Sequence, residues 1–446
     1  MIKSLKMQTN EGLKQEIGLF GLTSNIINTV IGSGIFVLPA LVSEGLGPAG
    51  ILAYLFCGFL ITMVMLCFAE VGSKITITGG AYAYIEAAFG KYFGFITTNL
   101  FIFGASLMAT AAVANAIADT LAYLLPIFTD KIFRAFFFVI IFSCLTFINS
   151  RGVKEGITLI KLTTLLKLTP LVLLICWGIT KVKIENLTWT SLPAITDFGK
   201  ISLILFFAFQ GAENSLSVSG EVKNPAKTIP RSILLSTLVI LIIYAGVHSV
   251  AQGILGESLS GSKNAPLAET AMKIMGPFGK TLMILGAALS MFGYLSSDIL
   301  NMPRVMFRSA KDNVIPIKSL AAVHQRFATP FVSIIVFTVL GCFFAIVGGF
   351  RQLAILSTSS VLLIYLGVAL AVIKLRMKEK KSSHLTFRIP GGLLVPLLAI
   401  IIISWFLTNI DAKEIISLFI FISALTIVYF LLSLNNSSSK LKSEKL

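Results

Sequence analysis

Two long apolar segments of this chain are interrupted by the stretches Ile31-Gly32-Ser33-Gly34-Ile35-Phe36 and Phe209-Gln210-Gly211-Ala212-Glu213-Asn214-Ser215. Small and polar residues at these places predict that each helix is broken partway along, which leaves backbone N–H and C=O groups unpaired. Inside a membrane, an unpaired group is costly unless it lines a cavity or binds something. The two stretches therefore predict a binding site built from unwound backbone.

The composition indicates an integral membrane protein. Of the 446 residues, 56% are hydrophobic and 13% are charged, which is too apolar for a soluble protein of ordinary surface polarity. Apolar stretches of about 20 residues, the length that crosses the hydrocarbon core, recur along the whole chain. The twelve predicted spans are Ile17–Leu41, Pro48–Val71, Phe93–Leu125, Ile132–Asn149, Glu155–Ile179, Phe198–Gly220, Arg231–Leu255, Gly279–Met302, Phe331–Phe350, Leu353–Ile373, Gly391–Thr408 and Glu414–Ser433.

The net charge of +16 is explained by orientation in the membrane rather than by a nucleic acid partner. Basic residues gather in two loops that the span order places on one side, so these loops and both termini are predicted to be cytoplasmic, where they can contact anionic lipid. The basic residues of the two loops are Arg304, Arg308, Lys311, Lys318 and Arg326, and Lys374, Arg376, Lys378, Lys380, Lys381 and Arg388.

The two breaks fall in the first and sixth spans, which predicts an internal repeat. Spans one to five (residues 17–180) and six to ten (197–375) each open with a broken segment, and an odd number of spans inverts the second copy. Residues 391–433 hold two further spans, 1–16 a cytoplasmic N-terminus, and 434–446 a Ser/Lys-rich cytoplasmic tail predicted to be disordered. The predicted fold class is an all-α membrane protein with twelve transmembrane helices in a 5+5 inverted repeat plus two.

Short helices outside the spans are expected at Gly79–Phe89 and Asn264–Met275. The cysteines and histidines lack the paired spacing of a disulfide framework or a metal site, so no metal and no cofactor are expected. No nucleophile elbow or acid/base cluster is visible, so no enzymatic activity is expected. These residues are Cys57, Cys67, Cys144, Cys176 and Cys342, and His248, His324 and His384.

A broken helix can hold both ends of a zwitterion, because the half that starts at the break presents N–H groups and the half that ends there presents carbonyls. A carboxylate is expected near Gly34-Ile35 and Gly211-Ala212, and an ammonium near Ile31 and Phe207. This arrangement fits an α-amino acid. The predicted backbone site comprises Ile31, Gly32, Ser33, Gly34, Ile35, Phe207, Gly211 and Ala212; alternatively, the glycines only allow close helix packing.

Two ionisable residues lie deep within predicted spans, where charge is usually retained for function. Glu213 is a candidate gate or proton site, with a structural carboxylate that bonds nearby amides as the alternative. Lys167 is too far from the membrane surface to reach it and needs an internal partner. Lys167 is expected to take the place of a sodium ion between the first and eighth spans, bonding carbonyls near Ile31 and the hydroxyl of Ser296 or Ser297.

Four further residues are candidates for the cavity. Asp298 either pairs inward near the interface or faces the cavity and reads a polar or cationic side chain. Phe207 is a candidate aromatic lid, with core packing as the alternative. Thr110 and Ser357 are candidates for the wall contributed by the third and tenth spans.

Together these motifs resemble the amino acid–polyamine–organocation transporters, which share the 5+5 inverted-repeat fold of LeuT. The resemblance covers essentially the whole chain. It implies amino-acid transport by alternating access, with the substrate's amino and carboxylate groups held at the unwound segments. It rests on residues 31–36 and 207–213, on Ala69-Glu70 ahead of Gly79-Gly80-Ala81-Tyr82, and on Glu221-Val222-Lys223-Asn224-Pro225-Ala226-Lys227-Thr228-Ile229-Pro230.

Two features of the resemblance imply different coupling. The Phe-x-Gly-x-Glu pattern that ends at Glu213 is similar to bacterial amino-acid/amine exchangers, which have a tryptophan gate where this chain has Phe207 and a substrate-facing aromatic where it has Asp298. Lys167 instead matches the lysine of proton-coupled, sodium-independent members.

The expected function is sodium-independent amino-acid transport across the cytoplasmic membrane, coupled to protons, with exchange as the alternative. A receptor that binds without transport and a channel are further alternatives, although polar residues clustered at the breaks favour a carrier over a lasting polar pathway. The expected partners are a small amino acid, protons and membrane lipid, and no nucleic acid is expected.

Overall fold

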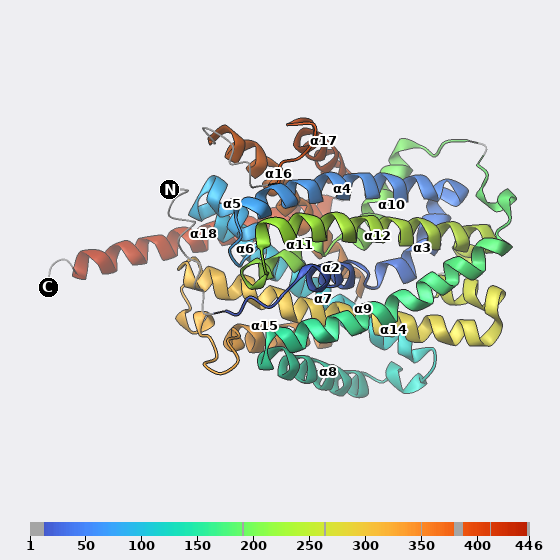
Figure 1. The fold of residues 1–446 in the computed structure, drawn as a ribbon, viewed down its shortest axis with the longest axis horizontal. Coiled ribbons are helices and arrows are strands. Elements are labelled where there is room, and N and C mark those ends of the chain that lie inside the picture. Colours follow the sequence, from blue (N-terminus) through green and yellow to red (C-terminus); the bar gives the residue numbers. More distant parts are fainter. Residues whose placement is uncertain are drawn as a thin grey trace.

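The computed structural model describes residues 13–189, 191–262, 265–348, 350–378, 387–410 and 412–443. These residues are almost entirely helical; among them, extended backbone pairs only in an isolated bridge between Ile17 and Val222. Most helices run roughly along the long axis of the molecule (Figure 1). The predicted all-α membrane class is confirmed.

The helices follow the predicted spans closely. The N-terminal half contains α2 (Leu19–Val30), α3 (Gly34–Leu46), α4 (Gly50–Lys74), α5 (Ala81–Phe89), α6 (Lys91–Asn99), the π-helical segment η2 (Leu100–Ser106), α7 (Leu107–Ala122), α8 (Lys131–Arg151) and α9 (Val153–Gly178). The C-terminal half contains α10 (Ile195–Phe206), η6 (Phe207–Phe209), α11 (Ala212–Ser215), η7 (Leu216–Glu221), α12 (Pro225–Leu255), α13 (Ser258–Gly261), α14 (Pro266–Lys311), α15 (Phe331–Val347), α16 (Phe350–Lys378), α17 (Leu394–Thr408) and α18 (Ala412–Ser443).

Within the described residues, nine helical runs are long and apolar enough to cross a membrane, and α15 and α17 are shorter apolar helices. This number is lower than twelve for a physical reason. The break after α2 leaves that helix with only 12 residues, and α3 and α4 run on as one stretch, Gly34–Lys74. The span count depends on how broken and short helices are treated, so the twelve-span repeat stays a prediction.

The segments next to the two breaks lie inside the helical bundle. Helix α2 packs against α9, α11, α12 and α14, and α14 also packs along α7 and α9. The surface of α7 carries small buried residues such as Ala111, Ala112 and Ala114, which allow neighbouring helices to come close. Helix α18 is the most exposed apolar helix and projects from one end of the molecule (Figure 1).

Both short helices outside the spans are confirmed. Helix α5 begins at Ala81, and the first part of α14 runs from Pro266 to a kink at Gly276, where φ is +68°. The bounds of α18 extend to Ser443, and the disorder expected for the 434–446 tail stays a prediction. Most of the N-terminal segment (residues 1–12) and Lys380 and Lys381 of the second basic loop lie outside the described residues.

Candidate functional site

The first break separates α2 from α3 at Ile31–Ser33. Ile31 leaves the helical region with φ −77° and ψ 85°, and the N–H groups of Ser33–Ile35 meet no acceptor among the described residues. A glycine is needed at the start of α3, because a Cβ on Gly34 would lie 2.7 Å from the Cβ of Ala208. The first break therefore packs directly against the residues before the second.

The second break separates η6 from α11 at Gln210 and Gly211. Gly211 adopts φ +114°, a conformation that side-chain-bearing residues rarely adopt. A Cβ on Gly211 would also lie 2.8 Å from the carbonyl oxygen of Thr29. Both the backbone conformation and the close approach to α2 require glycine here.

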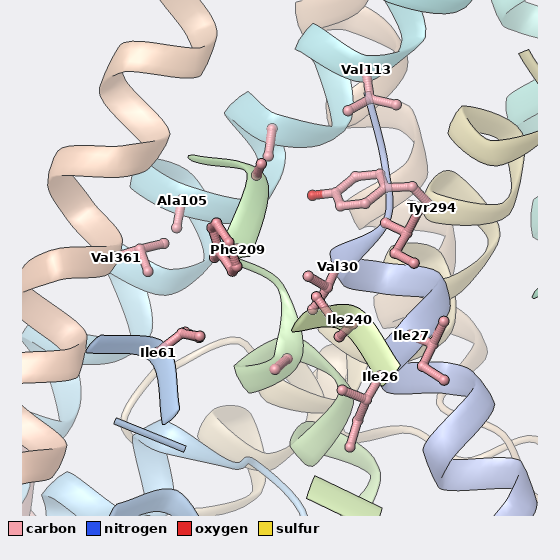
Figure 2. Close-up of a cluster of buried hydrophobic side chains, with 14 of the residues drawn as sticks. Ile26, Ile27, Val30, Ile61, Ala105, Val113, Phe209, Ile240, Tyr294 and Val361 are labelled. Atoms are coloured by element: carbon pink, nitrogen blue, oxygen red, sulfur yellow. The ribbon is translucent and has the colours of Figure 1, made fainter. Parts of the chain in front are cut away.

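Side chains tie the two breaks together. The Tyr244 hydroxyl, from α12, lies 3.2 Å from the Val30 carbonyl and 2.7 Å from the Ala208 carbonyl, so it faces the ends of both interrupted helices. The hydroxyls of Thr29 and Ser215 are 3.0 Å apart and link α2 to α11. Val30 and Phe209, next to the two breaks, belong to one cluster of buried apolar side chains (Figure 2).

Lys167 of α9 is completely buried and meets the C-terminal end of α2. Its ammonium donates to the carbonyl of Asn28 at 2.9 Å and to that of Ile31 at 2.5 Å. The unpaired carbonyls at a helix C-terminus favour a cation. Ser290 of α14 also donates to the Ile31 carbonyl, at 2.9 Å, so three helices meet at this one oxygen.

The Ile31 carbonyl is a predicted partner of Lys167, but neither predicted serine hydroxyl meets its ammonium. Ser297 instead accepts a hydrogen bond from the Asn28 side chain at 2.9 Å. The Ser296 hydroxyl has no partner within the described part of the chain. The one-residue step between these serines turns them to different sides of α14, and the Lys167 ammonium points to the end of α2 instead.

Glu213 turns back onto its own break. Its carboxylate accepts from the Gly211 N–H, at 3.1 Å and 3.0 Å to the two oxygens, and from the Tyr365 hydroxyl of α16 at 2.6 Å. This carboxylate occupies one of the N–H groups predicted to hold a substrate carboxylate. It also links the second break to α16, a geometry compatible with both a gate and a structural carboxylate.

Asp298 is completely buried and does not pair with Arg304, which binds Glu221 instead. One oxygen of Asp298 accepts from Asn214 at 2.6 Å, and the other accepts from Ser106 and Thr110, each at 2.5 Å. The carboxylate therefore joins α14 to α7 and to α11.

A cavity of about 30 Å³ lies between the breaks, with room for one or two waters. The predicted residues that line it are Gly32, Ser33, Gly34, Phe207, Gly211, Glu213 and Ser357. The remaining predicted residues lie outside its lining and are Ile31, Ile35, Ala212, Thr110, Asp298, Lys167, Ser296 and Ser297. Thr110 and Asp298 reach it only through residues that they bond, and the Ile31 carbonyl is already used by Lys167 and Ser290.

Several residues of this region were not singled out from the sequence. Asn28 donates to the Gly293 carbonyl at 2.7 Å, and the Asn25 and Asn301 side-chain amides bond each other. Asn214, Tyr244 and Tyr365 also belong to this group. The sequence signal that could have identified them is a polar side chain within an apolar span, because such a side chain needs a partner inside the protein.

The sequence matches the amino acid permease family over residues 17–438. It is 30% identical over 400 residues to the serine/threonine exchanger SteT of Bacillus subtilis (strain 168), an alignment that covers 88% of this chain and 90% of SteT. The branched-chain amino acid permease BcaP of the same organism is 26% identical over 446 residues, with 96% and 95% covered. The human large neutral amino acids transporter small subunit 2 is 27% identical over 337 residues, with 71% and 62% covered. The chain belongs to the amino acid permease family of the amino acid–polyamine–organocation superfamily of transporters.

Proposed function

We propose that this protein carries amino acids across the cytoplasmic membrane by alternating access, without sodium and coupled to protons. Its family membership and the cavity between two broken helices support this function. The substrate class is taken from the relatives, which are named for serine and threonine in one case and for branched-chain amino acids in another. The proposal includes twelve spans, inverted repeats over 17–180 and 197–375, two added spans over 391–433, and both termini in the cytoplasm.

The observation that carries sodium independence is the position of the Lys167 ammonium. It occupies the Asn28 and Ile31 carbonyls at the end of α2, where a sodium ion would otherwise tie this helix to α14. A buried ammonium supplies the same positive charge without a metal. Loss of its proton would release the end of α2, so proton movement and rearrangement of the first break would be linked.

The substrate carboxylate is assigned to the N–H groups of Ser33–Ile35, because these lack an acceptor among the described residues. Gly211 is a weaker candidate, since its N–H already bonds Glu213. The substrate ammonium is assigned to carbonyls of the 207–210 segment, because the Ile31 carbonyl already accepts from two donors.

Exchange is the second candidate, because Glu213 joins the second break to Tyr365 of α16 at 2.6 Å. If this contact opens only when substrate is bound, the empty carrier would return slowly and transport would require substrate on both sides. SteT, a relative, is named as an exchanger.

Purified protein in liposomes tests the proposal. We expect an inward proton gradient, or substrate inside the vesicle, to drive uptake of a radiolabelled amino acid equally well in sodium and in choline buffers. Lys167→Ala should reduce uptake at least about tenfold, which corresponds to about 1.4 kcal/mol in the barrier. The control is Lys161→Ala, on the same helix but exposed, which should transport normally.

Absolute sodium dependence would contradict the role of Lys167, as would normal uptake by Lys167→Ala. Binding of an amino acid without any flux would favour a receptor. Uptake that requires internal substrate, and does not respond to a proton gradient, would select exchange over proton symport.

A further inference from the structure

One wall of the cavity is set by a carboxylate that the substrate does not need to touch. Asp298 lies behind the cavity and accepts from Asn214, Ser106 and Thr110. Asn214 and Ser106 line the cavity, whereas Asp298 and Thr110 do not. Asp298 therefore acts on the cavity through these two side chains.

The chemistry of a carboxylate fixes how Asn214 is turned. An ionised carboxylate only accepts hydrogen bonds, so the Asn214 amide must direct its NH₂ group at Asp298 and its oxygen away. That oxygen has no partner in the described portion of the chain, and the residue is only 4% exposed. Ser106 likewise gives its only hydroxyl hydrogen to Asp298 and can offer the cavity lone pairs alone.

The wall made by η2 and α11 is consequently an acceptor surface. A buried acceptor without a donor is costly, and a ligand that supplies the donor removes this cost. Ser33 and Gln210, which also line the cavity, have a hydroxyl and an amide nitrogen without partners in the described residues. The cavity thus contains several unsatisfied polar groups within a small space.

We infer that Asp298 is a positioning residue for specificity, and that the substrate is a small amino acid whose side chain donates a hydrogen bond, as a hydroxyl does. This inference rests on the proposed function and narrows its substrate class. The side-chain hydroxyl would donate to the Asn214 oxygen or to Ser106, while the backbone groups of the breaks hold the amino and carboxylate ends. The cavity of about 30 Å³ holds one or two waters, so a substrate must enlarge it, and a short side chain requires the smallest change.

Threonine and valine test the inference, because they have nearly the same shape and differ by a hydroxyl in place of a methyl group. The full-length protein in liposomes should take up threonine with a kcat/KM at least about tenfold above that for valine, since a site built to hydrogen-bond a hydroxyl rejects an analogue that lacks it. In Asp298→Asn the preference for threonine over valine should remain, because a hydroxyl accepts as well as donates. An asparagine there can donate to Asn214 and turn its NH₂ group to the cavity, so this variant should raise the ratio of kcat/KM for O-methylserine, whose side-chain oxygen only accepts, to that for threonine. A purely structural loss would lower both rates and leave the ratio unchanged.

Two further variants keep the test decisive if Asp298→Asn does not fold. Asn214→Leu removes the acceptor and should favour valine. Thr338→Val is the control and should keep the threonine preference, because the Thr338 hydroxyl bonds the Ile334 carbonyl of its own helix and lies outside the cavity lining. Equal uptake of threonine and valine by the unmodified protein would overturn this inference alone. An unchanged ratio of O-methylserine to threonine in Asp298→Asn, or of threonine to valine in Asn214→Leu, would also overturn it. Preference for lysine over threonine would also overturn it, because the Glu213 and Asp298 carboxylates would then attract the substrate side chain by their charge. Failure to bind or transport any amino acid would instead overturn the proposed function.

Discussion

Arg304 and Glu221 are both completely buried, and their side chains bond at 2.8 Å. Arg304 also donates to the Leu300 carbonyl at 2.6 Å. The pair joins α14 to the end of η7, beside the point where the Glu221 carbonyl accepts from the Ile17 N–H. A charge buried at this depth depends on its partner, so the cost of removing only one member is expected to be large.

Glu221→Gln should lower the free energy of unfolding by about 3–5 kcal/mol, because it leaves the Arg304 guanidinium buried without a counter-charge. Thermal unfolding in detergent measures the effect. The matched control is Glu269→Gln, which removes a half-exposed pair with Lys280 and should cost less than about 1 kcal/mol. Equal losses of unfolding free energy in the two variants would contradict the expected cost of an unpaired buried charge. Replacing both Glu221 and Arg304 by apolar residues should restore much of the stability lost in Glu221→Gln.

The sequence predicts which individual residues matter where their depth in an apolar span is the only criterion. Lys167 and Glu213 stand out because charge is rare in an apolar span. Their partners were predictable only in part, since these depend on how each helix is rotated and how far it has slid along its neighbours. Lys167 meets the predicted Ile31 carbonyl, 136 positions earlier, and the Asn28 carbonyl beside it, but neither of the two serines that were predicted with them.

The glycines of the two broken helices are the most specific local signal in the chain. Gly211 combines a left-handed φ with an approach to the Thr29 carbonyl, and Gly34 admits Ala208. The sequence located both breaks because glycine and polar residues interrupt the apolar runs. The π-helical segment η2, which carries Ser106 to Asp298, has no such marker and was not predicted.

Gly211→Ala should abolish most transport and lower the unfolding temperature, because the new Cβ would lie 2.8 Å from a backbone oxygen that cannot move without shifting α2. Gly47→Ala is the matched control. Gly47 also has a positive φ, of 53°, but nothing lies within 4 Å of its Cβ position, so it isolates the conformational cost of about 1–3 kcal/mol. Transport by Gly211→Ala at the level of Gly47→Ala would mean that close contact between the breaks is dispensable.

At the scale of the whole molecule, hydropathy predicts which segments are apolar but not which faces meet. The count of spans depends on the short or interrupted helices, which are α2, α15 and α17. The positions of the basic loops predict the orientation of the chain in the membrane, because basic residues are retained on the cytoplasmic side. The orientation is therefore a consequence of the full span order, and one misassigned helix would invert everything after it.

Labelling of single cysteines tests this order directly. In a variant without the five native cysteines, Glu185→Cys lies in the exposed segment after α9, which twelve spans place outside. Lys318→Cys lies in the exposed segment after α14, which they place inside. A membrane-impermeant maleimide should label Glu185→Cys in intact cells and Lys318→Cys only after permeabilisation, with retained amino-acid uptake as the check on folding. Labelling of both sites in intact cells would mean that the count of spans between α9 and α14 is wrong, because three crossings place the two segments on opposite sides and an even number would place them on the same side.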